Sequence, residues 1–365
     1  MKIRFFLLLF FCYPLICMAH QSGMHPNTQI QYVKLQIEKK AEPYYSAYLQ
    51  LIHVADSLLD MPQHALKNLS VPGYYINPEG HRSRSSLLSE DAFAAYTCAL
   101  SYRLSGKQKY GEKACYFLNA WGTINKEYSD SDGALVLTYD GTALLIAAEL
   151  MFDSPVWTED AKMQFSQWVT LVYQQATDSI RIRKNNWGDW GRFGSLLCAS
   201  FLNNSQNFNF NVQLIKSDLD QRIAPDGRMV EEIKRGKNGI WYTYFSLAPI
   251  TASCWVIYNR TGENLFLSKK EGVLIKKALD YLLYYAKHPD KWKWALNPRS
   301  GKGELWPENL LEAMSGVYKD NKYTKFLKHK RPIIYSFHHY AWTFPTLMPL
   351  RIGTYQESTL LPDHY

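Results

Sequence analysis

Three polar clusters stand out from the apolar, helical patterning of this 365-residue chain. An arginine fork suits bidentate capture of a carboxylate, and an amide can donate a hydrogen bond to a developing oxyanion. A positioned side chain beside them could transfer a proton. The clusters are residues 184–192 (Lys-Asn-Asn-Trp-Gly-Asp-Trp-Gly-Arg), residues 231–236 with 241–245 (Glu-Glu-Ile-Lys-Arg-Gly and Trp-Tyr-Thr-Tyr-Phe), and residues 336–340 (Ser-Phe-His-His-Tyr).

The second cluster has the most specific spacing. Arg235-Gly236 is followed after five residues by Tyr242, and then by Phe245 and Leu247. This order resembles the Arg-Gly to Tyr-x-x-Phe-x-Leu element of the alginate lyase family of (α/α)-toroid polysaccharide lyases. The family's Asn-Asn-His segment is similar to residues 185–187, and its early helices are similar to residues 99–121. The likeness spans roughly residues 70 to 260.

The resemblance implies a lyase that cleaves a uronic-acid polymer, alginate or a relative such as glucuronan, by β-elimination. In that reaction the carboxylate is neutralised, a base removes the C5 proton, and an acid protonates the departing O4. The resemblance gives Tyr242 the role of base, acid or both. Arg235 would neutralise the carboxylate and lower the pKa of the phenol, which is otherwise near 10. Asn186 would stabilise the enolate-like intermediate.

The sequence departs from the family at Trp187, where the family has a histidine. An indole neither neutralises a carboxylate nor takes a proton, so this role is either absent or supplied by another residue. We rank His81 first, in what we expect to be a polar loop with Arg84, and the pair His338-His339 second. Two adjacent histidines point in different directions, so a shared metal ion is not expected.

Substrate contacts are expected around this catalytic group. Aromatic rings stack on the apolar faces of sugars, although most rings in a chain of this kind pack in the core. The expected substrate-binding residues are Trp187, Trp190, Arg192, Tyr244, Arg84, His338 and His339.

Each candidate catalytic residue could also have a purely structural role. Tyr242 could be a core tyrosine, Arg235 could pair with Glu231 or Glu232, and Asn185 is expected to cap a helix. Two other functions stay open. A glycoside hydrolase would use two carboxylates from Asp140, Asp189, Glu231 and Glu232. A binding protein that has lost the histidine would hold uronate oligomers without turnover.

The elements that must position these residues are predicted to be helices. Apolar residues recur at helical spacing, and Ser105-Gly106 separates the first pair. Repeated antiparallel pairs of this length predict an all-α fold, an incomplete (α/α) toroid with an open cleft at one end. The predicted helices are residues 91–104, 110–121, 141–152, 159–177, 190–202, 242–258, 271–287 and 307–318.

The first 19 residues have the basic start, short apolar run and small final residue of a signal peptide. Residues 20–365 are then expected to form a single toroid domain. We expect this domain to be a monomer that is secreted or periplasmic, with no membrane partner once the signal peptide is cleaved. The 41 Lys+Arg residues against 33 Asp+Glu give a net charge of +8, which favours an anionic partner. The basic runs are too short to predict nucleic-acid binding.

No cofactor or metal site is predicted. The sequence contains no phosphate-binding Gly-rich loop, nucleophile elbow or HExxH motif. Four cysteines follow the signal peptide, all in apolar helical contexts, and we expect them to be free and buried: Cys98, Cys115, Cys198 and Cys254.

Overall fold

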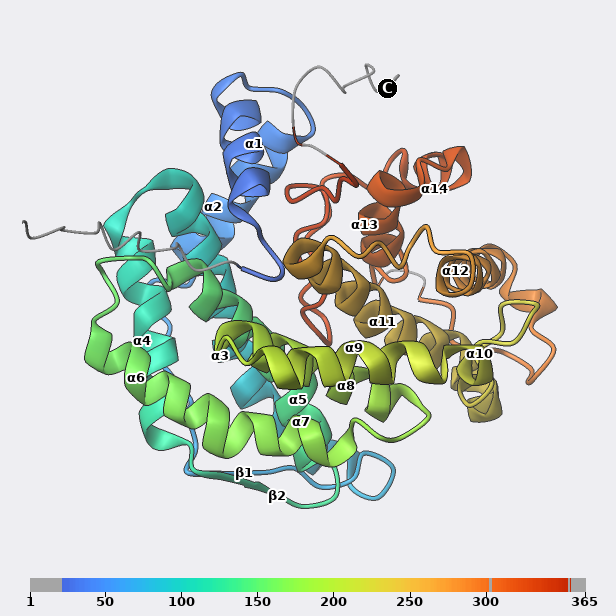
Figure 1. Cartoon of the computed structure of the whole chain (residues 1–365), viewed down its shortest axis with the longest axis horizontal. Helices are drawn as coiled ribbons and strands as arrows, with labels where there is room; N and C mark the ends of the chain where they lie inside the picture. Colours follow the sequence, from blue (N-terminus) through green and yellow to red (C-terminus); the bar gives the residue numbers. More distant parts are fainter. Residues whose placement is uncertain (1–21, 302–303, 354, 356–365) are drawn as a thin grey trace, which may run out of the picture.

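The computed structural model describes residues 22–301, 304–353 and 355, and Figure 1 shows that helices dominate them. Four largely buried helices pack side by side in chain order. A second set with exposed faces packs outside them, which confirms the predicted (α/α) toroid. The inner helices are α3 (Pro78–Ser105), α5 (Gly133–Met151), α8 (Asn186–Phe201) and α11 (Gly239–Thr261). The outer helices are α4 (Gln108–Ile124), α6 (Glu159–Trp168) continuing through η1 (Val169–Tyr173) into α7 (Gln174–Ile180), α9 (Ser205–Ser217) and α12 (Glu271–Lys287).

The interval between α11 and α3 is filled by the C-terminal segment, residues 333–350, rather than by another long helix. In this segment the Tyr340 hydroxyl donates to the Ser89 carbonyl of α3 at 2.6 Å. The Trp342 indole donates to Thr251 Oγ1 of α11 at 3.0 Å. The toroid is therefore incomplete in its helices but closed by packing. The remaining elements are α1 (Asn27–Glu38), α2 (Tyr44–Ser57), β1 (Asn68–Ser70), β2 (Glu127–Ser129), α10 (Leu219–Arg222), η2 (Glu232–Asn238), η3 (Pro289–Lys291), α13 (Glu308–Tyr318) and α14 (Asn321–Leu327).

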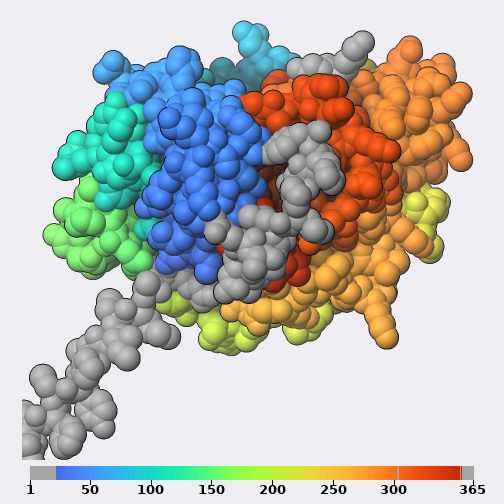
Figure 2. Space-filling model, turned by 90° about the horizontal axis from the view of Figure 1, so that it is seen from above, coloured from blue at the N-terminus to red at the C-terminus, as the bar shows by residue number. Residues whose placement is uncertain are grey.

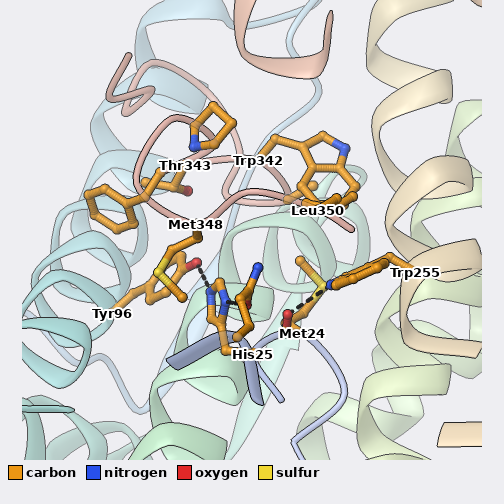
Figure 3. A pocket seen from close by; sticks show the side chains of 12 residues that line it. Met24, His25, Tyr96, Trp255, Trp342, Thr343, Met348 and Leu350 are labelled. Atoms are coloured by element: carbon orange, nitrogen blue, oxygen red, sulfur yellow. Dashed lines mark hydrogen bonds between the residues drawn. The ribbon is translucent and has the colours of Figure 1, made fainter. Parts of the chain in front are cut away.

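The two ends of the described chain meet on one face. Figure 2 shows the N-terminal helices beside the C-terminal segment, and Gln29 Nε2 donates to the Pro349 carbonyl at 3.0 Å. Beneath them His25 Nε2 lies 2.5 Å from the Tyr96 hydroxyl, beside a cavity of about 10 Å³ (Figure 3). Burial lowers the pKa of His25 to about 4. A cavity of this size holds at most one water molecule, so it is a packing feature and not a ligand site.

Helix α5 is buried along its whole length. All of its residues except Ala134 are buried, as expected of a helix that is apolar on every side. Among the residues described, it alone is long and apolar enough to cross a membrane, but it forms the centre of this core. The strands β1 and β2 pair in parallel beside its start, with Leu69 opposite Tyr128.

The predicted helices are found, with different ends. Helix α12 has the predicted bounds, whereas α3 begins at Pro78, and His81 lies in its first turn rather than in the expected loop. The Asn77 side chain caps α3 by accepting from the Gly80 amide at 2.9 Å, which is an ordinary helix-start signal. Helices α1, α2, α9, α10 and α14 lie outside the predicted ranges.

The predicted signal peptide, residues 1–19, lies outside the described residues. The four described cysteines are free and buried, as predicted.

A buried ionic network fastens α8 to its neighbours. The Asp189 carboxylate accepts hydrogen bonds from Arg222 and from Ser246 on α11. Arg192 Nη2 pairs with Asp218 Oδ2 at 2.8 Å. Burial lowers the pKa of Arg222 to about 9. A buried carboxylate that holds two elements together in this way is strongly destabilising to remove, because its partners are left without a counter-charge.

We therefore expect Asp189→Ala to lower the free energy of unfolding by about 3–5 kcal/mol, measured by urea denaturation. Asp226→Ala is the control, because Asp226 and its partner Arg228 are 53% and 41% exposed. Its expected loss is below about 1 kcal/mol. Equal losses in the two variants would contradict a structural role for the Asp189 network.

Candidate active site

Helices α8 and α11 both begin near the short helix η2. Gly236 gives η2 a kink, with φ of 56°, a conformation that favours glycine. Trp292 Nε1 donates to the Gly236 carbonyl at 3.0 Å and fixes the kink. Arg235 therefore directly precedes a turn that is fixed by this hydrogen bond. Tyr242 follows in the first turn of α11.

Glu232 connects η2 to the start of α8. Its Oε1 accepts from the Asn186 backbone amide at 2.6 Å, and its Oε2 accepts from Asn186 Nδ2 at 2.9 Å. Glu232 is 1% exposed and Asn186 is fully buried. Burial raises the pKa of Glu232 to about 7, against the opposing effect of the Asn186 hydrogen bonds.

This contact corrects the prediction for Asn185. Asn185 occupies the N-cap position of α8, but its side chain makes no capping hydrogen bond. Glu232, 46 residues away in sequence, satisfies the first amide of the helix instead.

Arg235 and Tyr242 are stacked. The Arg235 guanidinium carbon lies 4.6 Å from the centre of the Tyr242 ring. Burial raises the pKa of the Tyr242 hydroxyl, as does its hydrogen bond with Tyr75. Arg235 acts in the predicted direction and lowers this pKa, but it is outweighed. Tyr242 is therefore a neutral phenol in the free protein at neutral pH.

Tyr75 is a residue that the sequence prediction missed. Its hydroxyl lies 2.9 Å from the Tyr242 hydroxyl, although the Tyr75 side chain is 62% exposed. It belongs to the segment between β1 and α3, in which Tyr74, Tyr75 and Ile76 are all exposed. In the sequence, the run Tyr74-Tyr75-Ile76 directly after the turn residues Pro72-Gly73 is a signal that could have pointed to it.

His81 is oriented by the same segment. Its Nδ1 lies 3.0 Å from the Pro72 carbonyl and 3.2 Å from Asp132 Oδ2. Its ring meets that of Tyr74 edge to face at 5.4 Å. The Tyr74 amide also donates to Asp132, at 2.9 Å. His81 thus belongs to the group of side chains that holds the Tyr74–Tyr75 segment, and its catalytic role in place of the family histidine stays a prediction.

His338 lies among aromatic rings. Its ring stacks on Tyr139 at 4.9 Å and contacts Trp241 and Phe245 edge to face at 5.0 Å. Burial lowers the pKa of His338 to about 3, and the charges of Arg299 and His81 act in the same direction. His338 is therefore neutral. It is partly exposed and remains a candidate for substrate contact.

Four predicted substrate-binding residues are corrected by the structure. Their side chains are almost completely buried, so they present no surface to a polysaccharide. Arg192 is bound to Asp218, and the other three pack against one another. The four are Trp190, Arg192, Tyr244 and His339.

The other two predicted contacts are accessible. Arg84 is exposed on the first turns of α3, and its substrate contact stays a prediction. Trp187 is half-buried, and the Arg183 guanidinium carbon lies 4.2 Å from the centre of its ring.

The carboxylates available to a hydrolase are engaged elsewhere. Asp140, Asp189 and Glu232 are at most 2% exposed. Asp189 belongs to the ionic network, and Glu231 pairs with Lys234 at 2.6 Å. The arrangement therefore offers no pair of accessible carboxylates among these four residues to flank a glycosidic bond.

Comparison with known proteins decides the family. The sequence profile described as alginate lyase matches residues 32–292. The chain belongs to the alginate lyase family. This membership confirms the predicted class of enzyme, a polysaccharide lyase acting on a uronic-acid polymer.

Solved structures of alginate lyases share the fold of this alginate lyase family member. Alginate lyase A1-III from Sphingomonas species A1 superposes with a TM-score of 0.70 at 15% identity, covering 93% of this chain and 99% of that one. A variant of A1-III complexed with a tetrasaccharide superposes with a TM-score of 0.72 at 15% identity, with the same coverage of both chains. An alginate lyase from Bacteroides ovatus superposes with a TM-score of 0.69 at 19% identity, covering 90% of this chain and 98% of that one. A search of curated protein sequences finds no match.

The raised pKa of Glu232 predicts a pH dependence of stability. Because the folded pKa lies near 7 and the ordinary value is 4.5, the folded state binds more protons between these values. The Glu232 contribution therefore disfavours folding increasingly as pH rises from about 4.5 to about 7, by at most about 1.4 kcal/mol per pH unit. Glu232→Gln should lack this contribution in denaturation curves measured across the window.

The matched control is Glu263→Gln, because Glu263 is 41% exposed and pairs with Lys216. It should keep the slope of the unchanged protein. A Glu232→Gln variant with that same slope would show that the carboxyl is not protonated in this range.

Proposed function

We propose that this lyase performs β-elimination on a polyuronate with Tyr242, Arg235 and Asn186 as its catalytic residues. The observation that carries the proposal is the link between the two chain segments. Glu232 holds Asn186 at the start of α8, and Arg235, three residues after Glu232, is stacked on Tyr242. A donor amide, a positive charge and a phenol are thereby joined through one short helix.

Arg235 would bind the carboxylate of the sugar that reacts. Asn186 is fully buried and donates to Glu232 in the free protein, so it would reach this carboxylate only if its amide turned away from Glu232. Neutralising this group makes the C5 proton more acidic, and hydrogen bonds to its oxygens stabilise the enolate-like intermediate. Arg235 forms no ion pair among the described residues, and burial raises the pKa of Glu232, the hydrogen-bond partner of Asn186, which favours the neutral form of that carboxyl.

Tyr242 would move the proton. As a phenolate it removes the C5 proton, the C4–O4 bond breaks, and a C4=C5 double bond forms. The resulting phenol then returns the proton to O4 of the departing sugar. Because the free phenol is protonated, the phenolate must form in the substrate complex. Tyr75, whose hydroxyl lies 2.9 Å from that of Tyr242, can relay this proton toward solvent by releasing its own proton as it takes the one from Tyr242.

This use of one residue constrains the substrate. A single side chain can reach the C5 hydrogen and O4 only when they lie on the same face of the sugar ring. Mannuronate and glucuronate meet this condition, whereas guluronate has the opposite configuration at C5. Trp187 cannot act as a base on the other face. We therefore infer that polymannuronate blocks of alginate, or glucuronan, are cleaved in preference to polyguluronate.

The remaining sequence expectations accompany this proposal. They are export by the N-terminal signal to the periplasm or the medium, action as a monomer, and no partnership with nucleic acid or membrane. The excess of basic residues supports an anionic polymer as substrate.

The test is elimination by the mature protein on polymannuronate, polyguluronate and glucuronan, followed by the ultraviolet absorbance of the unsaturated product. Tyr242→Phe should reduce kcat by about a thousandfold or more, because proton transfer in both directions is lost. Tyr284→Phe is the control, since Tyr284 is an exposed tyrosine on α12 and should leave the rate unchanged.

Other outcomes assign the alternatives. New reducing ends without ultraviolet absorbance would indicate hydrolysis. Binding of the polymers without any turnover would indicate a protein that retains the site but not the reaction. An active Tyr242→Phe variant would contradict the role of the phenol.

A further inference from the structure

Two arginines near the proposed site are held on aromatic rings without an acidic partner. The Arg235 guanidinium lies on Tyr242 and the Arg183 guanidinium lies on Trp187, at 4.6 and 4.2 Å from the ring centres. Within the described part of the chain neither forms an ion pair. Arg181, two residues before Arg183, is by contrast paired with Asp178 at 3.0 Å. The charge of Arg235 acts on nearby Glu232. The exposed guanidinium of Arg183 is thus left without a carboxylate partner among the described residues.

Arg183 is anchored by its backbone as well as by its ring contact. Its carbonyl accepts from Arg192 Nη2 at 3.5 Å, and its amide donates to the Ile180 carbonyl at 3.1 Å. The backbone passes so close to Gly188 that a Cβ there would lie 1.8 Å from the Arg183 carbonyl oxygen. The turn before α8 is therefore rigid, while the guanidinium at its tip is exposed.

Helix geometry separates this charge from the reacting carboxylate. Asn186 and Trp187 are consecutive residues of α8, and consecutive helical side chains do not face the same way. Asn186 turns to Glu232, whereas Trp187 carries Arg183. A polyuronate has one carboxylate on every sugar, so a charge displaced from the reacting unit would meet a carboxylate of another unit.

We propose that Arg183, held on Trp187, is a binding site for the carboxylate of a second uronate unit of the same polymer. This inference rests on the proposed function and adds a subsite to it. Trp187 supports the guanidinium and does not take part in proton transfer. The planar guanidinium suits this position because it can lie on the indole and still offer its edge to a carboxylate.

The test compares Arg183→Gln with the unchanged protein on polymannuronate and on the shortest mannuronate oligomer that the unchanged protein cleaves. On the polymer KM should rise about tenfold and kcat should stay within about twofold, because one charge-assisted contact is lost away from the reacting bond. On the shortest oligomer both constants should change little. Trp187→Leu, which keeps the charge but removes its support, should raise KM on the polymer by a smaller factor.

Arg103→Gln is the matched control. Arg103 lies at the C-terminal end of α3, whereas His81 lies at its start, and the Arg103 guanidinium donates a hydrogen bond to Asn27. This variant should leave KM unchanged. A fall in kcat with constant KM in Arg183→Gln would place the charge at the reacting carboxylate and overturn the proposal. Unchanged constants on both substrates would overturn it as well.

Failure of the proposed function is distinguishable from failure of this inference. If the unchanged protein shows no elimination, calorimetric titration with polymannuronate still compares Kd for the two proteins. A Kd about tenfold weaker in Arg183→Gln would support the subsite in a binding protein. Equal Kd values would overturn it.

Discussion

The site depends on a single buried carboxylate. Glu232 is enclosed at the start of α8 and accepts two hydrogen bonds from Asn186, one from the backbone and one from the side chain. This contact joins two segments that lie 46 residues apart in sequence. The carboxylate serves as the helix cap and also orients the amide that the proposed reaction uses. Burying it is unfavourable, as its raised pKa indicates. A strained electrostatic position beside a stacked arginine and tyrosine is typical of functional sites.

The rest of the toroid keeps these segments in register. The Asp189 network ties α8 to α11 and to Arg222, one turn beyond the Asn186 contact. The C-terminal segment connects α11 to α3, which carries His81. The Tyr74–Tyr75 segment, which precedes α3, then reaches Tyr242. Each catalytic candidate thus comes from the beginning of an inner helix or its preceding loop, while the core of the same helices fixes their relative positions.

Much of this was predictable from sequence, and the failures have physical causes. Helical periodicity and the Arg235–Tyr242 spacing led to the toroid and the family. The burial of individual side chains was harder to predict. Trp190 and Tyr244 are of residue types that bind sugars, but they pack in the core. Contacts between residues far apart in the sequence were the hardest to predict. No local pattern indicates that Glu232 caps α8 or that Tyr75 reaches Tyr242, because both contacts are set by how the helices pack.

The claim that η2 and α8 together form one carboxylate site is tested most directly by a double-variant cycle. The measurement is kcat/KM on polymannuronate for Asn186→Ala, Arg235→Gln and the double variant, each corrected for its folded fraction. If both residues bind the same carboxylate, the double variant should lose much less than the product of the two single losses, because residues acting as a unit are not additive. Losses that multiply fully would mean that the two residues act independently, and would contradict a single site.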